Sequence, residues 1–173
     1  MDNFTNRMIR AAKLEVNLYE EVEADKSTLT QAMGVVVLAS VAAGIGQVFR
    51  DGATGLILGT VSALVGWYIW AYLTYFIGTR LLPEPQTEAN HGELLRAIGF
   101  SSSPGILRIF GIIPLLGGLI VAIASIWMLV AMIIAVRQAL DYSSTWRAVG
   151  VCAIGWVVYV IIVGFLTFIV PGI

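Results

Sequence analysis

The residues that could do chemistry in an apolar setting gather in one short stretch, GFSSSPGILR, which runs from Gly99 to Arg108. Its three hydroxyl groups stand directly before Pro104, whose nitrogen carries no hydrogen to donate. Hydroxyls in this place can bond the backbone carbonyls that a proline leaves without a partner. Together with the guanidinium of Arg108 they can also line a path for a polar solute. The candidate residues are Gly99, Phe100, Ser101, Ser102, Ser103, Pro104 and Arg108.

Patterns for catalysis and metal binding are absent from the sequence, which holds no Ser–His–Asp set, no HExxH and no glycine-rich phosphate loop. His91, the single histidine, lies in a polar connection, and Cys152, the single cysteine, has no partner at ligand spacing. All eleven acidic residues lie outside the long apolar runs, where proton and cation carriers usually place a carboxylate. We therefore expect no enzyme, no metal and no cofactor, and transport becomes the weaker hypothesis.

The composition places the chain in a membrane. Hydrophobic residues make up 58% of the sequence and charged residues 12%, with a mean hydropathy of +0.88. A soluble domain carries about 25% charged residues, so this chain has too few polar residues to cover the surface of a soluble protein. The formal net charge of −1 gives no bulk attraction to nucleic acid. The lipid bilayer is therefore the first partner that we expect, and nucleic acid is not one.

The apolar runs predict one membrane domain, residues 30–173, behind a charged N-terminal segment, residues 1–29. Four runs are long enough to cross about 30 Å of hydrocarbon as helices. They cover approximately residues 30–49, 54–77, 115–137 and 147–170. Residues 93–112, which contain the serine and proline stretch, are the open case: a crossing helix, a re-entrant loop or a broken linker.

Basic residues favour the crossing helix, because cytoplasmic loops carry an excess of lysine and arginine. With five crossings and the N-terminus inside, eight of the ten basic residues lie on the inner side, and Arg50 and Arg108 lie outside. A re-entrant segment gives seven against three. Pro104 interrupts the helical hydrogen bonds of such a crossing. We predict an all-α integral membrane protein, a five-transmembrane-helix bundle whose third helix, 93–112, is kinked.

The N-terminal segment predicts an amphipathic helix over residues 2–23, because apolar side chains recur there at helical spacing. We expect this helix to rest in the headgroup plane with its apolar face in the lipid. The alternative is a cytoplasmic helix that packs on its own protein or on a partner. The side chains expected at the membrane surface are Phe4, Met8, Leu14, Leu18 and Val22.

Small residues recur four positions apart in the predicted crossings, as in GLILG. In lipid, such positions let two helices approach closely. We favour packing within the bundle; the alternative is a seam with a second copy or with another membrane protein. The predicted packing positions are Ser40, Gly44, Gly55, Gly59, Ala63, Gly118 and Ala122.

The layout resembles the Yip (Ypt-interacting protein) membrane family: a cytoplasmic N-terminal segment, five crossings, and a Gly-aromatic pair followed by proline at the third crossing. The matching residues are Gly99-Phe100 and Pro104, and the stretches NLYEEVEADKS and IAVRQALDYSSTWRAV are similar to prokaryotic members. In eukaryotic relatives the family is associated with Rab GTPases through an Asp-Leu-Tyr-Gly-Pro motif. Only Leu18-Tyr19 matches that motif here, so we do not expect a Rab-type GTPase as a partner.

These features predict a non-enzymatic membrane-organising or scaffold protein that binds lipid, a second copy or another membrane protein, for example as an accessory subunit of a larger complex. We expect it in a prokaryotic cytoplasmic membrane, with the N-terminus inside and the C-terminus on the opposite side. The alternative is a small transporter or channel in which Ser101, Ser102, Ser103 and Arg108 line the pathway.

Overall fold

The computed structural model describes residues 3–46 and 48–169, and the side chains of residues 3–46 and 55–162. Every regular element in these residues is a helix. The α-helices are α1 (Phe4–Ala12), α2 (Val16–Ala24), α3 (Leu29–Gly46), α4 (Val48–Phe76), α5 (His91–Ser101), α6 (Gly117–Ala139) and α7 (Thr145–Ile169). Three shorter elements join them: the 3₁₀ turn η1 (Lys26–Thr28), the π-helical η2 (Ile77–Leu81) and the 3₁₀ helix η3 (Ser103–Ile112).

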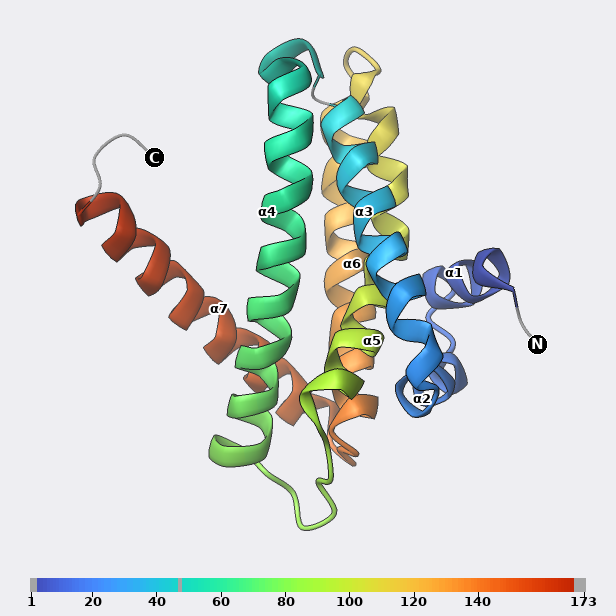
Figure 1. The fold of residues 1–173 in the computed structure, drawn as a ribbon, viewed down its shortest axis with the longest axis vertical. Coiled ribbons are helices and arrows are strands. Elements are labelled where there is room, and N and C mark those ends of the chain that lie inside the picture. The colour runs from blue at the N-terminus through green and yellow to red at the C-terminus, as the bar shows by residue number, and fades with distance from the viewer. Residues whose placement is uncertain (1–2, 47, 170–173) are drawn as a thin grey trace.

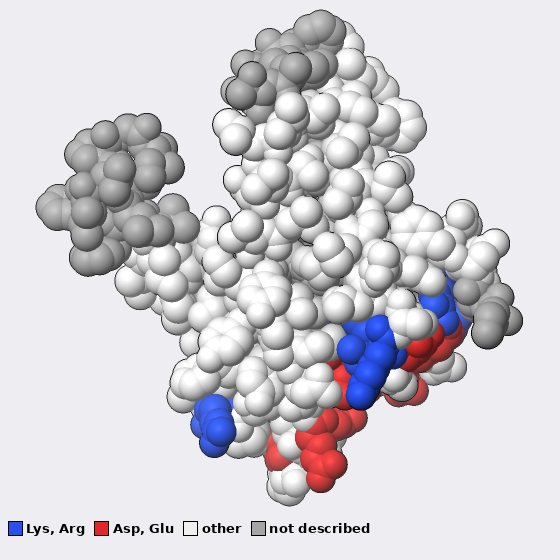
Figure 2. Space-filling model, in the orientation of Figure 1, with Lys and Arg blue, Asp and Glu red and all other residues white. Residues whose placement is uncertain are grey.

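Helices α3, α4 and α6 form an apolar shaft along the long axis of the molecule, with α5 and η3 between α3 and α6 (Figure 1). Four described segments are long and apolar enough to cross a membrane: Lys26–Gly46, Gly55–Leu81, Gly117–Ala139 and Thr145–Ile162. Figure 2 shows the charged side chains of one face gathered at the lower end of the shaft, beside α1 and α2. An apolar shaft whose described charged side chains gather mainly at one end has the form of an integral membrane protein.

The segment predicted as one kinked helix over 93–112 consists of two helices of different type. Helix α5 ends at Ser101, and η3 begins at Ser103 with Pro104 in its first turn. Because proline cannot donate to the α-helical ladder, the chain continues in the tighter 3₁₀ pattern. Figure 1 shows α5 and η3 rising together from the charged end to the opposite end, where α6 begins. The stretch thus connects the two ends of the shaft without being a continuous α-helix.

The N-terminal helix that we predicted as a single element is divided into α1 and α2 at Leu14, whose φ of 63° is left-handed. Both helices pack against the charged end of the shaft. Leu18 and Val22 are fully buried, and Phe4 and Met8 pack against the same core. The prediction of a lipid-facing strip is therefore wrong for Leu18 and Val22, because α5 and α6 cover that face of α2.

Apart from Phe100 near the end of α5, the largest buried side chains lie at the charged end, whereas mostly small side chains fill the shaft. Tyr19, Leu94 and Leu140 are fully buried, and they belong to α2, the first turn of α5 and the residue after α6. Helix α5 comes close to α3 at Gly99, where an added Cβ would lie 2.7 Å from the Cβ of Ala32. Small residues allow this approach, and lipid itself supplies no hydrophobic drive for it. Along α3 and α6 the buried residues are mostly alanine, namely Ala32, Ala39, Ala42, Ala124, Ala131, Ala135 and Ala139.

Candidate functional site

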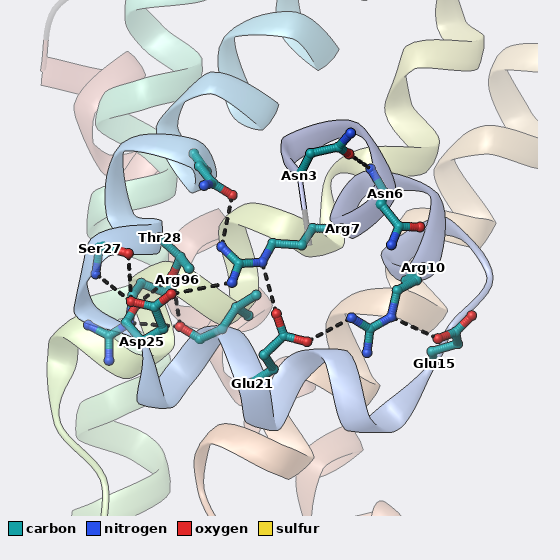
Figure 3. A network of polar contacts seen from close by, with 12 residues as sticks. Asn3, Asn6, Arg7, Arg10, Glu15, Glu21, Asp25, Ser27, Thr28 and Arg96 are labelled. Atoms are coloured by element: carbon teal, nitrogen blue, oxygen red, sulfur yellow. Dashed lines mark hydrogen bonds and ion pairs between the residues drawn. The ribbon is translucent and has the colours of Figure 1, made fainter. Parts of the chain in front are cut away.

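A network of charged side chains fixes the N-terminal helices to the shaft (Figure 3). Arg7 of α1 is 8% exposed. Its Nε lies 2.9 Å from Glu21 Oε1, and its terminal nitrogens lie 3.3 Å from Asp25 Oδ2 and 3.2 Å from Gln31 Oε1. Glu21 belongs to α2, Asp25 follows it, and Gln31 belongs to α3. One guanidinium, with donors in three directions, therefore joins three helices.

The network continues on both sides of Arg7. Glu21 also accepts a hydrogen bond from Arg10 at 2.7 Å. Asp25 accepts from the backbone N–H and the hydroxyl of Ser27 at 2.9 and 2.6 Å. These bonds from Ser27, and then the charge of Arg7, lower the pKa of the Asp25 carboxyl. Asp25 therefore stays ionised and holds the turn η1 that leads into α3.

Arg96 of α5, which is 5% exposed, binds the C-terminal end of α2. Its Nε donates to the carbonyl oxygen of Val22 at 2.9 Å, and a terminal nitrogen contacts the carbonyl oxygen of Glu23. The last carbonyls of a helix have no partner within the helix and carry partial negative charge. Helix α2 has no basic residue in its own last turn, so Arg96 supplies the cation from another element. In the sequence, this contact is indicated by the lack of a basic residue in the last turn of α2.

Several carboxyl groups lie near this contact. Glu23 Oε2 is buried without a hydrogen-bond partner in the described part of the chain. Burial raises the pKa of Glu23 to about 7; the charges of Asp141, Glu93 and Glu20 add to this shift, and Arg96 opposes it. Glu23 therefore changes its charge near neutral pH, beside the bonds that hold α2.

A second junction joins the loop before α5 to the loop between α6 and α7. Glu84 accepts from the hydroxyl and the backbone N–H of Ser143 at 2.7 and 2.9 Å, and pairs with Arg147 at 3.3 Å. The hydroxyl of Tyr142 lies 2.8 Å from the carbonyl oxygen of Leu82. The hydrogen bonds from Ser143 lower the pKa of Glu84 to about 2. Glu84 thus keeps its charge at neutral pH and fixes the point from which α7 starts.

The serine and proline stretch both repairs the backbone and borders a partly open cavity. Ser101 and Ser103 donate hydrogen bonds of 2.7 Å to carbonyls three residues earlier, at the end of α5 where the ladder stops before Pro104. Phe100 is fully buried, and Gly99 provides the close approach to α3. The sequence predicted this repair by hydroxyls correctly, because it follows from local chain geometry.

A cavity of about 530 Å³, partly open to the surroundings, lies between α3, α4, α5, α6, α7 and η3. Of the candidate residues, Ser101, Ser102 and Arg108 line it, whereas Ser103 is not among its described lining residues. Arg108 Nε is buried there and has no hydrogen-bond partner in the described chain. The structure therefore brings together most of the polar groups that the sequence singled out.

The predicted packing positions have different surroundings, and their common role stays a prediction. An added Cβ at Gly44 would lie 2.4 Å from Leu56 Cδ1, so α3 and α4 approach closely there. Gly59 and Gly118 have no atom within 4 Å of an added Cβ. Ser40 and Ala63 line the cavity. Gly55 is half-buried and Ala122 is exposed.

We expect Arg96→Met to loosen the N-terminal helices, because the apolar stem remains while the donors to the α2 carbonyls are lost. The expected cost is about 2 kcal/mol of unfolding free energy, together with faster proteolysis before residue 29. Thermal unfolding and limited proteolysis in detergent measure both effects. Lys13→Met, at an exposed position, is the matched control and should leave both unchanged. If the two variants behave alike, Arg96 does not hold α2.

We expect the stability of the protein to fall as pH rises from about 4.5 to 7, since the folded state keeps the Glu23 proton that the unfolded chain has released. Glu23→Gln removes this dependence. The natural protein should lose unfolding free energy between pH 5 and pH 8, and the variant should not. After allowance for solvent screening, we expect the stability of the variant relative to the natural protein to be about 1 kcal/mol greater at pH 8 than at pH 5. Thermal unfolding at both pH values measures the difference. Glu88→Gln, at an exposed position, is the control, and an equal gain there would contradict the assignment to Glu23.

The Yip1 domain family matches residues 19–166 of the chain. This range begins in α2 and ends in α7, and it contains the Arg96 contact, the serine and proline stretch, and the cavity. No curated protein and no solved structure matches the chain. Because the matched range covers most of the membrane-embedded helices, the chain belongs to the Yip1 domain family.

Proposed function

We propose that this Yip1-family protein is a non-enzymatic membrane-organising protein that packs against another membrane protein through α7. The observation that carries the proposal is the position of this helix. Figure 1 shows α7 leaving the charged end and diverging from α4 along its length. At Gly155 the two helices still approach, since an added Cβ there would lie 3.3 Å from Trp70.

Beyond Gly155 the side chains of α7 are exposed on nearly every side of the helix. Trp156 is 62% exposed and Ile161 is 64% exposed. Lipid contacts an isolated helix equally on all sides and therefore favours no direction of tilt. The tilt of a membrane helix is set by packing against neighbouring helices. A partner helix beside α7 would bury this apolar surface. Other exposed members of the same surface are Ile154, Val157, Tyr159, Val160 and Ile162.

The proposed topology has five crossings in a prokaryotic cytoplasmic membrane, with the N-terminus in the cytoplasm and the C-terminus on the opposite side. The path of α5 and η3 along the whole shaft supports a crossing by this segment. The location of α1, α2 and the charged side chains at one end supports a cytoplasmic N-terminus, because basic residues are retained on that side.

A second candidate function is transport of a solute, for which the cavity beside Ser101, Ser102 and Arg108 is the supporting observation. In this reading the serine and proline stretch lines the pathway. Saturable uptake by liposomes that contain the purified protein alone would favour transport over a purely organising role.

We expect a photo-crosslinking residue at Trp156 to form an adduct in the native membrane, because that side chain lies on the surface proposed for the partner. The same probe at Ile126 of α6, which is also 64% exposed, is the matched control. Gel mobility and mass spectrometry identify the adduct. An adduct of twice the chain mass indicates a second copy, and a different mass indicates another membrane protein. Adducts no more frequent at Trp156 than at Ile126 would contradict the proposed role of α7.

A further inference from the structure

The cavity beside η3 has several polar groups in its mostly apolar lining, in the middle of the apolar shaft. Its volume of about 530 Å³ lies in the range of small-molecule sites. No aspartate or glutamate is among its described lining residues. The lining contains Arg108, the serines Ser40, Ser62, Ser101, Ser102 and Ser125, and three aromatic residues with a polar atom, Trp67, Trp70 and Tyr159.

Two buried donors of this lining lack an acceptor in the described chain: Arg108 Nε and the indole nitrogen of Trp70. Ser40, Ser101 and Ser125 donate their hydroxyl hydrogens to carbonyls of their own helices. A guanidinium is positively charged, and a buried donor without an acceptor is costly in an apolar surrounding. The cavity therefore offers positive charge and free donors, and the complementary ligand is an anion.

An apolar groove of about 410 Å³ adjoins the cavity. The two spaces share Trp67 and Ile69 as wall residues. The groove continues between α3 and α4 along Met33, Leu64 and Val65, with almost no polar surface. A ligand that occupies both spaces must combine a negative group with a hydrocarbon chain. The membrane around the protein supplies molecules of that chemistry.

We propose that the cavity binds the anionic head of a lipid-type amphiphile, a carboxylate or a phosphate, whose hydrocarbon chain lies along Trp67 in the groove. Arg108 forms charge-assisted hydrogen bonds to the head, and Trp70 donates a further one. The lining of this site shares Tyr159 with the surface proposed on α7, and binding there requires no passage of the ligand across the membrane.

The test measures binding to the purified full-length protein in nanodiscs of zwitterionic phosphatidylcholine. Radiolabelled oleate should bind saturably. Oleyl alcohol, which has the chain without the charge, and acetate, which has the charge without the chain, should bind at least about tenfold more weakly. Competition by phosphatidylglycerol or by inorganic phosphate then separates a lipid phosphate head from a free anion. Equal binding of oleate and oleyl alcohol, or displacement by inorganic phosphate alone, would overturn the proposal.

Variants assign the binding to the cavity. Arg108→Gln should weaken oleate binding by about tenfold or more, and Trp70→Phe by a smaller factor, because a neutral hydrogen bond contributes less than a charged one. Arg80→Gln, at an exposed position of η2, is the matched control and should bind as the natural protein does. Unchanged affinity in a folded Arg108→Gln variant would contradict the site. If that variant does not fold, the proposal is tested by the natural protein alone. Stronger binding of oleate than of oleyl alcohol supports it, and equal binding contradicts it.

Discussion

The contact between Arg96 and the last carbonyls of α2 organises the charged end of the molecule. It joins residues 74 positions apart in the chain and buries a guanidinium against two carbonyl oxygens that α2 cannot satisfy itself. Because Arg96 and Gly99 lie three residues apart on α5, both can face the packed elements on one side of that helix. The same helix therefore carries the bond to α2 and the close approach to Ala32 of α3. The position of α5 in turn sets where Ser101 and the start of η3 lie.

The middle of the shaft follows a different rule from the charged end. Large side chains such as Tyr19 and Leu140 fill the end, where water provides a hydrophobic driving force. Within the shaft, alanine and glycine allow close helix contacts. The change from α5 to η3 at Pro104 and the divergence of α7 leave a space that these small side chains do not fill. Arg108 and several serines border this space, so its mostly apolar wall carries polar groups at a depth where the surrounding surface is apolar.

Electrostatics divide the molecule in the same way. At the charged end, carboxylates and guanidinium groups are neighbours, and the pKa values of two carboxyl groups there, Glu84 and Glu23, shift in opposite directions. The pKa of Glu84 falls because Ser143 donates to the charged form, and the pKa of Glu23 rises because burial disfavours that form. Arg108, in contrast, borders the cavity without a hydrogen-bonded partner for its Nε. Most charged groups at the charged end thus have partners, with Glu23 Oε2 as an exception, whereas Arg108 Nε has none in the described chain.

The amino-acid sequence by itself determined the class of the protein, the approximate crossing segments and the break at Pro104. Hydropathy, charge and the lack of an N–H in proline act over a few neighbouring residues, so they can be read without knowledge of the fold. The tertiary structure decided which surface covers Leu18 and Val22, which carbonyls Arg96 binds, and which hydroxyls share a cavity with Arg108. An apolar helix face is satisfied equally well by lipid or by protein. Only the position of a complementary surface, supplied here to α2 by the distant helices α5 and α6, determines which of the two it meets.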